Sequence, residues 1–287
     1  MRFRTLVTVG CALLAGASGH VANAMDLGLK DKVVLVTGST SNIGYATARM
    51  FLREGATVII NSHQQAEIDA ALVKLQKETG RTPLSFRADV TKPEEIAALV
   101  AAHPRVDVLV NNVGGMIPAE FLKSTDEQWD ASWDLNVMSG VRLSRHYLPG
   151  MRDRNWGRII FISSESGLQI PTESIAYGAV KAAVIATARG LAEINAGTGV
   201  TVNSVLPGPT WDRDGTRAQG ALQRSGAKTF EEMEKSFITQ RRPTSIIQRF
   251  ASPDEVASLI VYTAGVQSSA TTGAALRVDG GVVKSAF

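Results

Sequence analysis

Two side chains near the middle of the sequence have the types and the spacing needed for proton transfer. Tyr177 and Lys181 are four positions apart in an apolar stretch, so in a helix they share one face, one turn apart. A phenol loses its proton at about pH 10, and a neighbouring positive charge stabilises the phenolate. We expect Tyr177 to act as a general acid and base and Lys181 to lower its pKa. Because an isolated pair of this kind is more often one buried aromatic residue and one solvated lysine, the rest of the sequence has to support this expectation.

A glycine-containing segment closer to the N-terminus, TGSTSNIG at residues 37–44, has the pattern of a phosphate-binding turn. It follows the apolar run KVVLVT and precedes a stretch with the apolar spacing of a helix. Gly38 permits a tight turn, Gly44 permits close packing of the helix, and a helix N-terminus offers N–H groups to a pyrophosphate. Asn42 stands where such turns usually have glycine, and asparagine tolerates left-handed backbone well. The segment therefore predicts a dinucleotide-binding turn.

These residues need a scaffold, and the sequence indicates one in which short β-branched runs alternate with longer amphipathic stretches. Nearly continuous apolar runs are typical of strands covered on both faces, as in a parallel sheet. The alternation predicts a single α/β domain over residues 25–287, with a doubly wound parallel sheet and with ligands at the carboxyl ends of its strands. The expected strands cover residues 32–37, 57–60, 83–86, 106–111, 158–163, 200–206 and 275–278.

Two segments carry recognisable helix starts, and one long segment has no strand character. TKPEE, beginning at Thr91, and SPDE, beginning at Ser252, combine a capping hydroxyl with an early proline and a glutamate. A polar, arginine-bearing segment, Trp211–Phe250, lies between the sixth and seventh expected strands. We expect this insertion, at about residues 210–250, to form a lid over the site rather than a second domain.

The composition is typical of a globular protein with an ample core, since 44% of the 287 residues are hydrophobic and 20% are charged. The net charge is only +3 and no dense basic stripe is visible, so a nucleic-acid partner is not favoured. The single cysteine, Cys11, and the four dispersed histidines do not cluster as metal ligands do. We therefore expect neither a nucleic acid nor a metal ion at the site.

Further motifs accompany the turn and the tyrosine in one order: NNVGG at 111–115, LNVMSG at 135–140, Ser164 thirteen positions before Tyr177, YGAVK, and PGPT at 207–210. In this combination the chain resembles the classical short-chain dehydrogenase/reductase family, from about Leu29 to Gly281. The resemblance implies the Rossmann fold and an NAD(P)-dependent oxidoreductase, which transfers a hydride between a nicotinamide cofactor and a carbonyl compound or secondary alcohol. The chain departs from the family pattern at Asn42 and at Val113, and both changes leave the catalytic positions intact.

The resemblance also implies a role for individual residues. Tyr177 would be the general acid in carbonyl reduction and the base in alcohol oxidation, and Lys181 would also hold the nicotinamide ribose. Ser164 would hydrogen-bond the substrate oxygen, whereas Ser163, on the opposite face of the strand, is interpreted as structural. Asn136 would anchor a water molecule for proton relay toward the lysine, although an asparagine within a helix is otherwise more often solvated or helix-bending.

The cofactor contacts implied by the resemblance come from several segments of the chain. Asp89 and Val90 would flank the adenine, and Thr210 would lie near the nicotinamide carboxamide. The full set is Gly38, Ser39, Thr40, Asn42, Ile43, Gly44, Asn61, Ser62, His63, Asp89, Val90, Asn111, Asn112, Val113, Gly114, Tyr177, Lys181, Pro207, Gly208 and Thr210.

The choice between NAD and NADP depends on the end of the second strand. Asn61 is interpreted as the position that usually holds an aspartate for the ribose 2′-hydroxyl in NAD enzymes. With no carboxylate there to repel a 2′-phosphate, and with Ser62 and His63 able to donate to it, the sequence favours NADP. NAD stays open as the alternative, because no arginine follows and Ser41 stands where many NADP enzymes have a basic residue.

Two other functions stay open. A 3-oxoacyl thioester reductase of the fatty-acid type would use the same residues, whereas a sensor without turnover would be expected to lose Tyr177 or Lys181. The substrate is expected to be a small molecule, and the arginines of the insertion are either solvated charges or partners of an anionic group on it. The resemblance suggests a homodimer or homotetramer, formed through the helices that carry Asn136 and Tyr177.

The first 24 residues differ from the rest of the sequence. Arginines at positions 2 and 4 precede an uncharged run that ends in ANA at Ala24, which is the order of a secretory signal peptide and too short for a convincing membrane span. The cofactor is cytosolic, however, and MDLGLKDKVVLVTG, from Met25, is where family members commonly begin. We expect a cytoplasmic enzyme that starts at Met25, with export through a signal peptide at residues 1–24 as the alternative.

Overall fold

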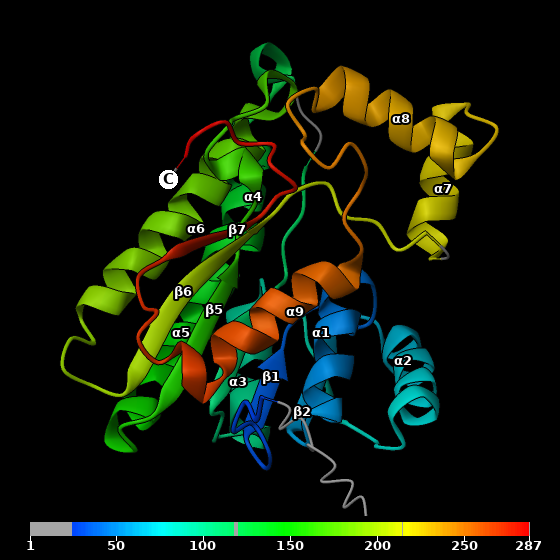
Figure 1. Cartoon of the computed structure of the whole chain (residues 1–287). Helices are drawn as coiled ribbons and strands as arrows, with labels where there is room; N and C mark the ends of the chain where they lie inside the picture. Colours follow the sequence, from blue (N-terminus) through cyan, green and yellow to red (C-terminus); the bar gives the residue numbers. More distant parts are fainter. Residues whose placement is uncertain (1–24, 118–119, 214, 287) are drawn as a thin grey trace, which may run out of the picture.

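The seven expected strands pair in one parallel sheet of order β3-β2-β1-β4-β5-β6-β7 (Figure 1). The computed structural model describes residues 25–117, 120–213 and 215–286, so the leader discussed above lies outside the described residues. The strand predictions are confirmed to within two residues at each end. Their bounds are β1 Val33–Val36, β2 Thr57–Ser62, β3 Leu84–Arg87, β4 Val108–Asn111, β5 Gly157–Ile162, β6 Val200–Pro207 and β7 Ala275–Val278.

The strand order reverses between β1 and β4, and this reversal places the site. β1 pairs with β2 on one side and with β4 on the other. At such a switch point the connections after two neighbouring strands diverge and leave a crevice at their carboxyl ends. The segments after β1 and β4 meet there, because the side-chain amide of Asn112 donates to the carbonyl oxygens of Thr37 (2.8 Å) and Gly38 (3.0 Å).

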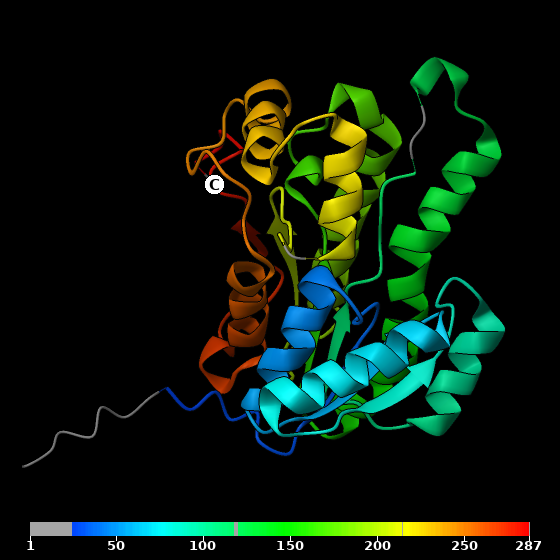
Figure 2. The same ribbon diagram turned by 90° about the vertical axis from the view of Figure 1, so that its right-hand side faces the viewer.

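Helices cover both faces of the sheet (Figure 2). One layer contains α1 (Asn42–Arg53), α2 (Gln65–Thr79) and α9 (Pro253–Ala264). The other contains α3 (Pro93–Ala102), α5 (Ser139–Asp153) and α6 (Ile175–Glu193), and α4 (Asp126–Trp133) runs into α5 through a π-helical turn, Asp134–Met138. The stretch Thr172–Glu193, which includes α6, is long and apolar enough to cross a membrane by length and composition alone. Val180, Val184 and Ala188 of this helix pack in the core against the sheet.

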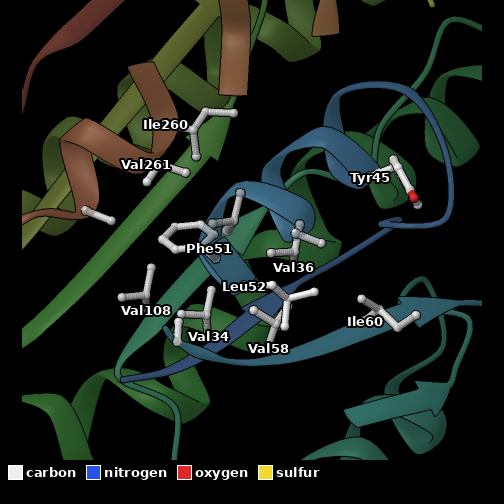
Figure 3. Packing of buried hydrophobic residues seen from close by; sticks show 14 of the residues in the cluster. Val34, Val36, Tyr45, Phe51, Leu52, Val58, Ile60, Val108, Ile260 and Val261 are labelled. Atoms are coloured by element: carbon white, nitrogen blue, oxygen red, sulfur yellow. The ribbon is translucent and has the colours of Figure 1, made fainter. Parts of the chain in front are cut away.

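Alternation along the strands explains why the sheet has two apolar faces. Val34 and Val36 of β1 pack toward α1 and α9, whereas Leu35 between them packs in the opposite cluster. Figure 3 shows Val34 and Val36 beside Phe51 and Leu52 of α1, with Val58 from the neighbouring strand. Because helices cover both faces of the sheet, the central strands are apolar at nearly every position.

The two expected helix starts have different outcomes. Ser252 caps α9 in a full capping box with Glu255, as predicted. The prediction for Thr91 is wrong, because Lys92 is the capping residue of α3 and supplies no side-chain cap. The hydroxyl of Thr91 donates instead to the Asp89 carboxylate at 2.7 Å.

The insertion between β6 and α9 consists mainly of two helices, α7 (Thr216–Ser225) and α8 (Phe230–Arg241). Figure 1 shows them beyond the carboxyl ends of the strands. They pack around a small apolar cluster of their own, with Met233, Ile238 and Phe250 at its centre. The described part of the insertion therefore contributes no strand to the sheet. It is a small helical subdomain near the crevice.

Candidate active site

A cavity of about 1120 Å³ lies at the carboxyl ends of the strands and brings together most of the residues singled out from the sequence. It extends from the turn after β1 and the end of β2 to the segment after β5 and the start of the insertion. Of the predicted site residues, those that line it are Gly38, Thr40, Asn42, Ile43, Gly44, Asn61, Ser62, His63, Asp89, Val90, Asn112, Val113, Gly114, Ser164, Tyr177, Lys181, Pro207, Gly208 and Thr210.

The turn at residues 37–44 has the conformation that a phosphate-binding turn requires. Gly38 and Asn42 both have left-handed backbone, with φ of +59° and +49°, so asparagine fulfils the glycine role as expected. A Cβ atom on Gly44 would lie only 2.3 Å from the carbonyl oxygen of Gly38. The first turn of α1 has neither an acidic residue nor a side-chain cap, so its N–H groups point to the cavity free of a competing anion. These residues fit a pyrophosphate.

Two predicted contact residues, Ser39 and Asn111, do not reach the cavity. The Ser39 hydroxyl is buried and accepts a hydrogen bond from the backbone N–H of Asn61 at 2.9 Å. The Asn111 amide is also buried and donates to the Ser144 hydroxyl at 3.1 Å. Both side chains hold the scaffold together, because alternation along the chain turns them away from the crevice.

Asn61 borders the cavity, but its side chain is bound to the backbone on three sides. Its amide nitrogen donates to the carbonyl oxygens of Phe86 (3.1 Å) and Ala88 (3.0 Å), and its oxygen accepts from the N–H of Gly38 (3.3 Å). This bridges β2, β3 and the phosphate-binding turn. Asn61 therefore does not present its side chain to a ribose, and its identity says nothing about a 2′-phosphate.

Lys181, Asn136 and Gly114 lie against one another near the proton-transfer group. The Lys181 ammonium is buried, donates to the carbonyl oxygen of Ile162 at 3.0 Å and lies 5.6 Å from the centre of the Tyr177 ring. A Cβ atom on Gly114 would lie 2.8 Å from both the Lys181 nitrogen and the Asn136 oxygen. Only glycine leaves room for this approach.

Asn136 lies in the π-helical turn and is not among the residues that line the cavity. Its amide accepts from the N–H of Gly115 and donates to the carbonyl oxygen of the same residue, both at 3.0 Å. It also donates to the carbonyl oxygen of Ser132. The side chain thus fixes the segment after β4 beside Lys181, and the expected role of Asn136 in a water-mediated relay stays a prediction.

The pKa of Tyr177 is shifted in the direction opposite to the one expected. Burial raises it to about 12, and the negative charge of Glu165 adds to this, while the hydrogen bond with Ser164 and the charge of Arg242 act in the other direction. Lys181 is not among the groups that shift this pKa, and burial lowers the pKa of the Lys181 ammonium itself to about 8. Tyr177 is therefore protonated at neutral pH, which is the form that a proton donor needs.

The buried ammonium of Lys181 has a measurable effect on stability. Its pKa is about 8 in the folded chain, against 10.5 for an exposed lysine. Between these values the unfolded chain binds a proton that the folded chain does not, so the free energy of unfolding rises with pH. Relative to Lys181→Met, we expect the wild type to gain up to about 3 kcal/mol as the pH rises through this window.

Urea unfolding of both proteins at a series of pH values between about 7 and 10.5 checks this expectation. A difference in free energy of unfolding that stays constant over the window would contradict a desolvated ammonium.

Ser164 is followed by a buried acid that the sequence did not single out. The Ser164 hydroxyl is hydrogen-bonded to the Glu165 carboxylate and accepts from the N–H of Ser166 at 3.1 Å. Glu165 in turn forms an ion pair with Arg242, at the end of α8, at 2.6 Å. The insertion is thereby attached to the segment that carries the serine. Ser163, as interpreted from the sequence, is structural, since its hydroxyl donates to the carbonyl oxygen of Lys181 at 2.7 Å.

The arginines of the insertion are largely paired within the chain. Arg213 forms ion pairs with Glu231 and Glu234, and Arg241 forms one with Glu173. Together with the Arg242 pair, these contacts give three arginines of the insertion, Arg213, Arg241 and Arg242, a carboxylate partner. They do not favour the alternative in which the insertion binds an anionic substrate group.

Comparison of the sequence with protein families identifies the family to which the chain belongs. Residues 32–219 match the family model described as short chain dehydrogenase. The chain belongs to the short-chain dehydrogenase/reductase family. Membership makes it an NAD(P)-dependent oxidoreductase with the Rossmann fold, and it agrees with the order of motifs from the phosphate-binding turn to PGPT.

Relatives of this short-chain dehydrogenase/reductase extend over nearly its whole length. An uncharacterized oxidoreductase, YvrD of Bacillus subtilis (strain 168), is 44% identical to this chain. The alignment covers 91% of this chain and all of YvrD. The 3-oxoacyl-[acyl-carrier-protein] reductase FabG of Thermotoga maritima is 30% identical, with 89% of this chain and 99% of FabG aligned. In structure, L-sorbose reductase from Gluconobacter frateurii, complexed with NADPH and L-sorbose, has a TM-score of 0.83 and is 32% identical. That comparison covers 91% of this chain and all of the reductase.

One acidic residue at the cavity of this family member was missed from the sequence. Glu67, in the first turn of α2, lines the cavity beside Ser62 and Thr40. A carboxylate about twenty residues after a glycine-containing turn is a known signal for a ribose contact. It was overlooked because the expectation considered only the end of the second strand, at Asn61.

Proposed function

We propose that the protein interconverts a small carbonyl compound and the corresponding secondary alcohol, with Tyr177 as the group that gives and takes the proton. The observation that carries this proposal is the position of Tyr177 and Lys181. They lie on one face of α6, beside Ser164, in the same cavity as a turn that fits a pyrophosphate. A nicotinamide cofactor and a proton donor would therefore reach one substrate.

Each side chain has a defined part in such a reaction. A bound nicotinamide would supply the hydride for reduction. Ser164 would hold the substrate oxygen beside the phenol, and Tyr177, which is protonated at neutral pH, would donate its proton to that oxygen. The ammonium of Lys181, one helical turn away, would stabilise the phenolate that remains. Oxidation of the alcohol would use the same groups in reverse.

The insertion supports a closed site in this proposal. Trp211 and Asp212, at its start, line the cavity, and Arg242, near its end, is bound to Glu165 beside Ser164. Both ends of the segment therefore lie at the reaction centre. We assign it the role of a lid that excludes water from the substrate.

The dinucleotide is NAD(H) or NADP(H), which differ only in the 2′-phosphate of the adenosine ribose. The NADPH in the L-sorbose reductase structure supports NADP(H), the cofactor that the sequence favoured. The uncharged Asn61 side chain does not repel a 2′-phosphate, but its bonds to the backbone leave it no evident contact with one.

A panel of ketones, ketoses, 3-oxoacyl thioesters and secondary alcohols, tested with both dinucleotides and followed by nicotinamide absorbance, tests the function. Turnover of at least one carbonyl or alcohol is the expected result. Preference for 3-oxoacyl thioesters would favour the second candidate, which the similarity to FabG supports. Tight dinucleotide binding without turnover of any compound would instead favour a sensor and would contradict the proposal.

A groove of about 570 Å³ on the outer surface of α5 and α6 supports the expected homodimer or homotetramer. Val141, Leu148, Leu191 and Ile194 contribute apolar surface to it. We propose that a second copy of the chain covers this groove. Light scattering coupled to gel filtration, on the wild type and on Ile194→Asp, tests it; a monomeric wild type would contradict it.

We further propose that the working enzyme is cytoplasmic and starts at Met25. In support, the proposed dinucleotide is a cytosolic metabolite, and Arg2 and Arg4 are separated by Phe3 and do not form the twin-arginine pair used for export of a folded protein. Fractionation of the native host with N-terminal peptide mapping tests the proposal. An exported protein accompanied by a precursor that carries Met1 would overturn it.

A further inference from the structure

The carboxylate of Glu67 is held by two hydroxyl groups at one end of the cavity. It accepts hydrogen bonds from Ser62 at 2.7 Å and from Thr40 at 3.1 Å, both at the same oxygen. The Ser62 oxygen also accepts from the N–H of Gln64 at 3.2 Å, which fixes the hydroxyl in the position from which it donates to the carboxylate. The carboxylate is therefore directed to the gap between the phosphate-binding turn and the end of β2.

This gap is where an adenosine ribose belongs. Thr40 is part of the turn that fits the pyrophosphate, and Ser62 ends the neighbouring strand. In folds of this kind the ribose lies between these two elements, and an acidic side chain about twenty residues after the turn accepts a hydrogen bond from its 2′-hydroxyl. Glu67 meets this spacing, although it comes from α2 rather than from the end of a strand.

The surrounding charges do not offset the negative charge of Glu67. The charged side chains that line the cavity are three acids, Glu67, Asp89 and Asp212, together with Lys181 and the titratable His63. Lys181 lies at the other end, beside Tyr177. Within the described ranges, no arginine lines the cavity and no lysine or arginine forms an ion pair with Glu67. A 2′-phosphate in this place would meet a carboxylate and no strong cationic partner.

We infer that Glu67 determines the choice of dinucleotide: its carboxylate accepts the ribose 2′-hydroxyl of NAD(H) and repels the 2′-phosphate of NADP(H). The inference rests on the proposed function, in that a nicotinamide dinucleotide has to bind in this cavity. It favours NAD(H), in contrast to the NADP(H) that the identity of Asn61 and the similarity to an NADPH-bound reductase suggested.

Fluorescence titration with NADH and NADPH tests the inference on the purified protein, without any substrate. We expect the wild type to bind NADH at least about tenfold more tightly than NADPH. Glu67→Gln keeps the size of the side chain and removes its charge, so the dissociation constant for NADPH should fall about tenfold while that for NADH rises modestly. Because Glu67 is exposed to solvent, the wild-type preference should also shrink between about 0.02 M and about 0.5 M salt.

Asp69→Asn is the matched control, since Asp69 lies on the same helix and its carboxylate accepts from the Gln65 side chain instead of facing the cavity. This variant should leave the ratio of the two dissociation constants unchanged. A purely structural role of Glu67 at the start of α2 would change the melting temperature and not the ratio.

The outcomes separate this inference from the function on which it rests. Wild-type protein that binds NADPH as tightly as NADH, or equal effects of Glu67→Gln and Asp69→Asn on the ratio, would overturn the role of Glu67 alone. Failure to bind either dinucleotide would overturn the proposed function and the inference with it. Adenosine 5′-monophosphate and adenosine 2′,5′-bisphosphate, compared by calorimetry, give the same discrimination for the ribose end alone.

Discussion

Tyr177→Phe should lower kcat by about 10²- to 10⁴-fold while the dissociation constant of the dinucleotide stays within about twofold of the wild-type value. The ring and its packing are retained, so the only loss is the hydroxyl that donates the proton. Steady-state kinetics with the best compound of the carbonyl panel, together with fluorescence titration of the dinucleotide, measure the two quantities separately. Near-normal turnover of this variant would remove Tyr177 from the reaction.

Tyr147→Phe provides the control for this change. Tyr147 is a buried tyrosine of α5 whose hydroxyl donates to the carbonyl oxygen of His103 at 3.0 Å, and it does not line the cavity. Loss of that hydrogen bond should cost about 1 kcal/mol of stability and leave kcat unchanged. A large fall in kcat for both variants would point to a general disturbance of the fold.

Gly44→Ala should weaken dinucleotide binding by at least about 100-fold. The added methyl group would lie 2.3 Å from the Gly38 carbonyl oxygen and 2.6 Å from the Asn112 amide nitrogen, so the turn and α1 have to separate. The N–H groups at the start of α1 would then no longer face a pyrophosphate. Fluorescence titration measures the affinity, and circular dichroism shows whether the fold is kept.

Gly190→Ala is the matched change at a glycine without this constraint. Gly190 lies in α6, and a Cβ atom there would have no neighbour within 4 Å. Alanine favours a helix over glycine, so stability should rise slightly and the affinity should not change. Wild-type affinity in Gly44→Ala would show that the turn does not bind the pyrophosphate.

Most of the fold could be predicted because a strand buried on both faces of the sheet appears in the sequence as a continuous apolar run. Val34, Leu35 and Val36 are apolar in succession since alternate side chains enter opposite layers. The helix starts were predicted less well, and they show what limits such predictions. Ser252 directly precedes its proline and caps α9, whereas Lys92 separates Thr91 from the proline of α3 and takes the capping position. A difference of one residue between the hydroxyl and the proline therefore decides whether that hydroxyl caps the helix.

The site was predicted well where the backbone defines it and poorly where side chains compete for partners. Gly38, Asn42 and Gly44 could be predicted because backbone conformation and close approach limit the residues allowed there. The direction of Asn61 could not, because three backbone groups from two other segments bind its amide.

Electrostatics depends even more on the tertiary structure. A sequence shows that Tyr177 and Lys181 share a helix face, but not that both are desolvated or that Glu165 lies beside the phenol. The resulting pKa of Tyr177 is therefore opposite in direction to the one predicted from the pair alone. The contribution of Glu67 was missed for a related reason, because its side chain reaches the cavity only when α2 packs beside the turn.

The reversal of strand order between β1 and β4 has a consequence for how this protein can be changed. Glu67 and the phosphate-binding turn belong to the half of the sheet that begins with β1, whereas Ser164, Tyr177 and the insertion belong to the half that begins with β4. The two halves are joined by the pairing of β1 with β4 and by the packing of α1 against α9, where Arg49 forms an ion pair with Asp254. An exchange of residues 37–67 that alters the coenzyme therefore has to keep the face of α1 that packs on α9, whereas Ser164 and Tyr177 lie outside the exchanged segment.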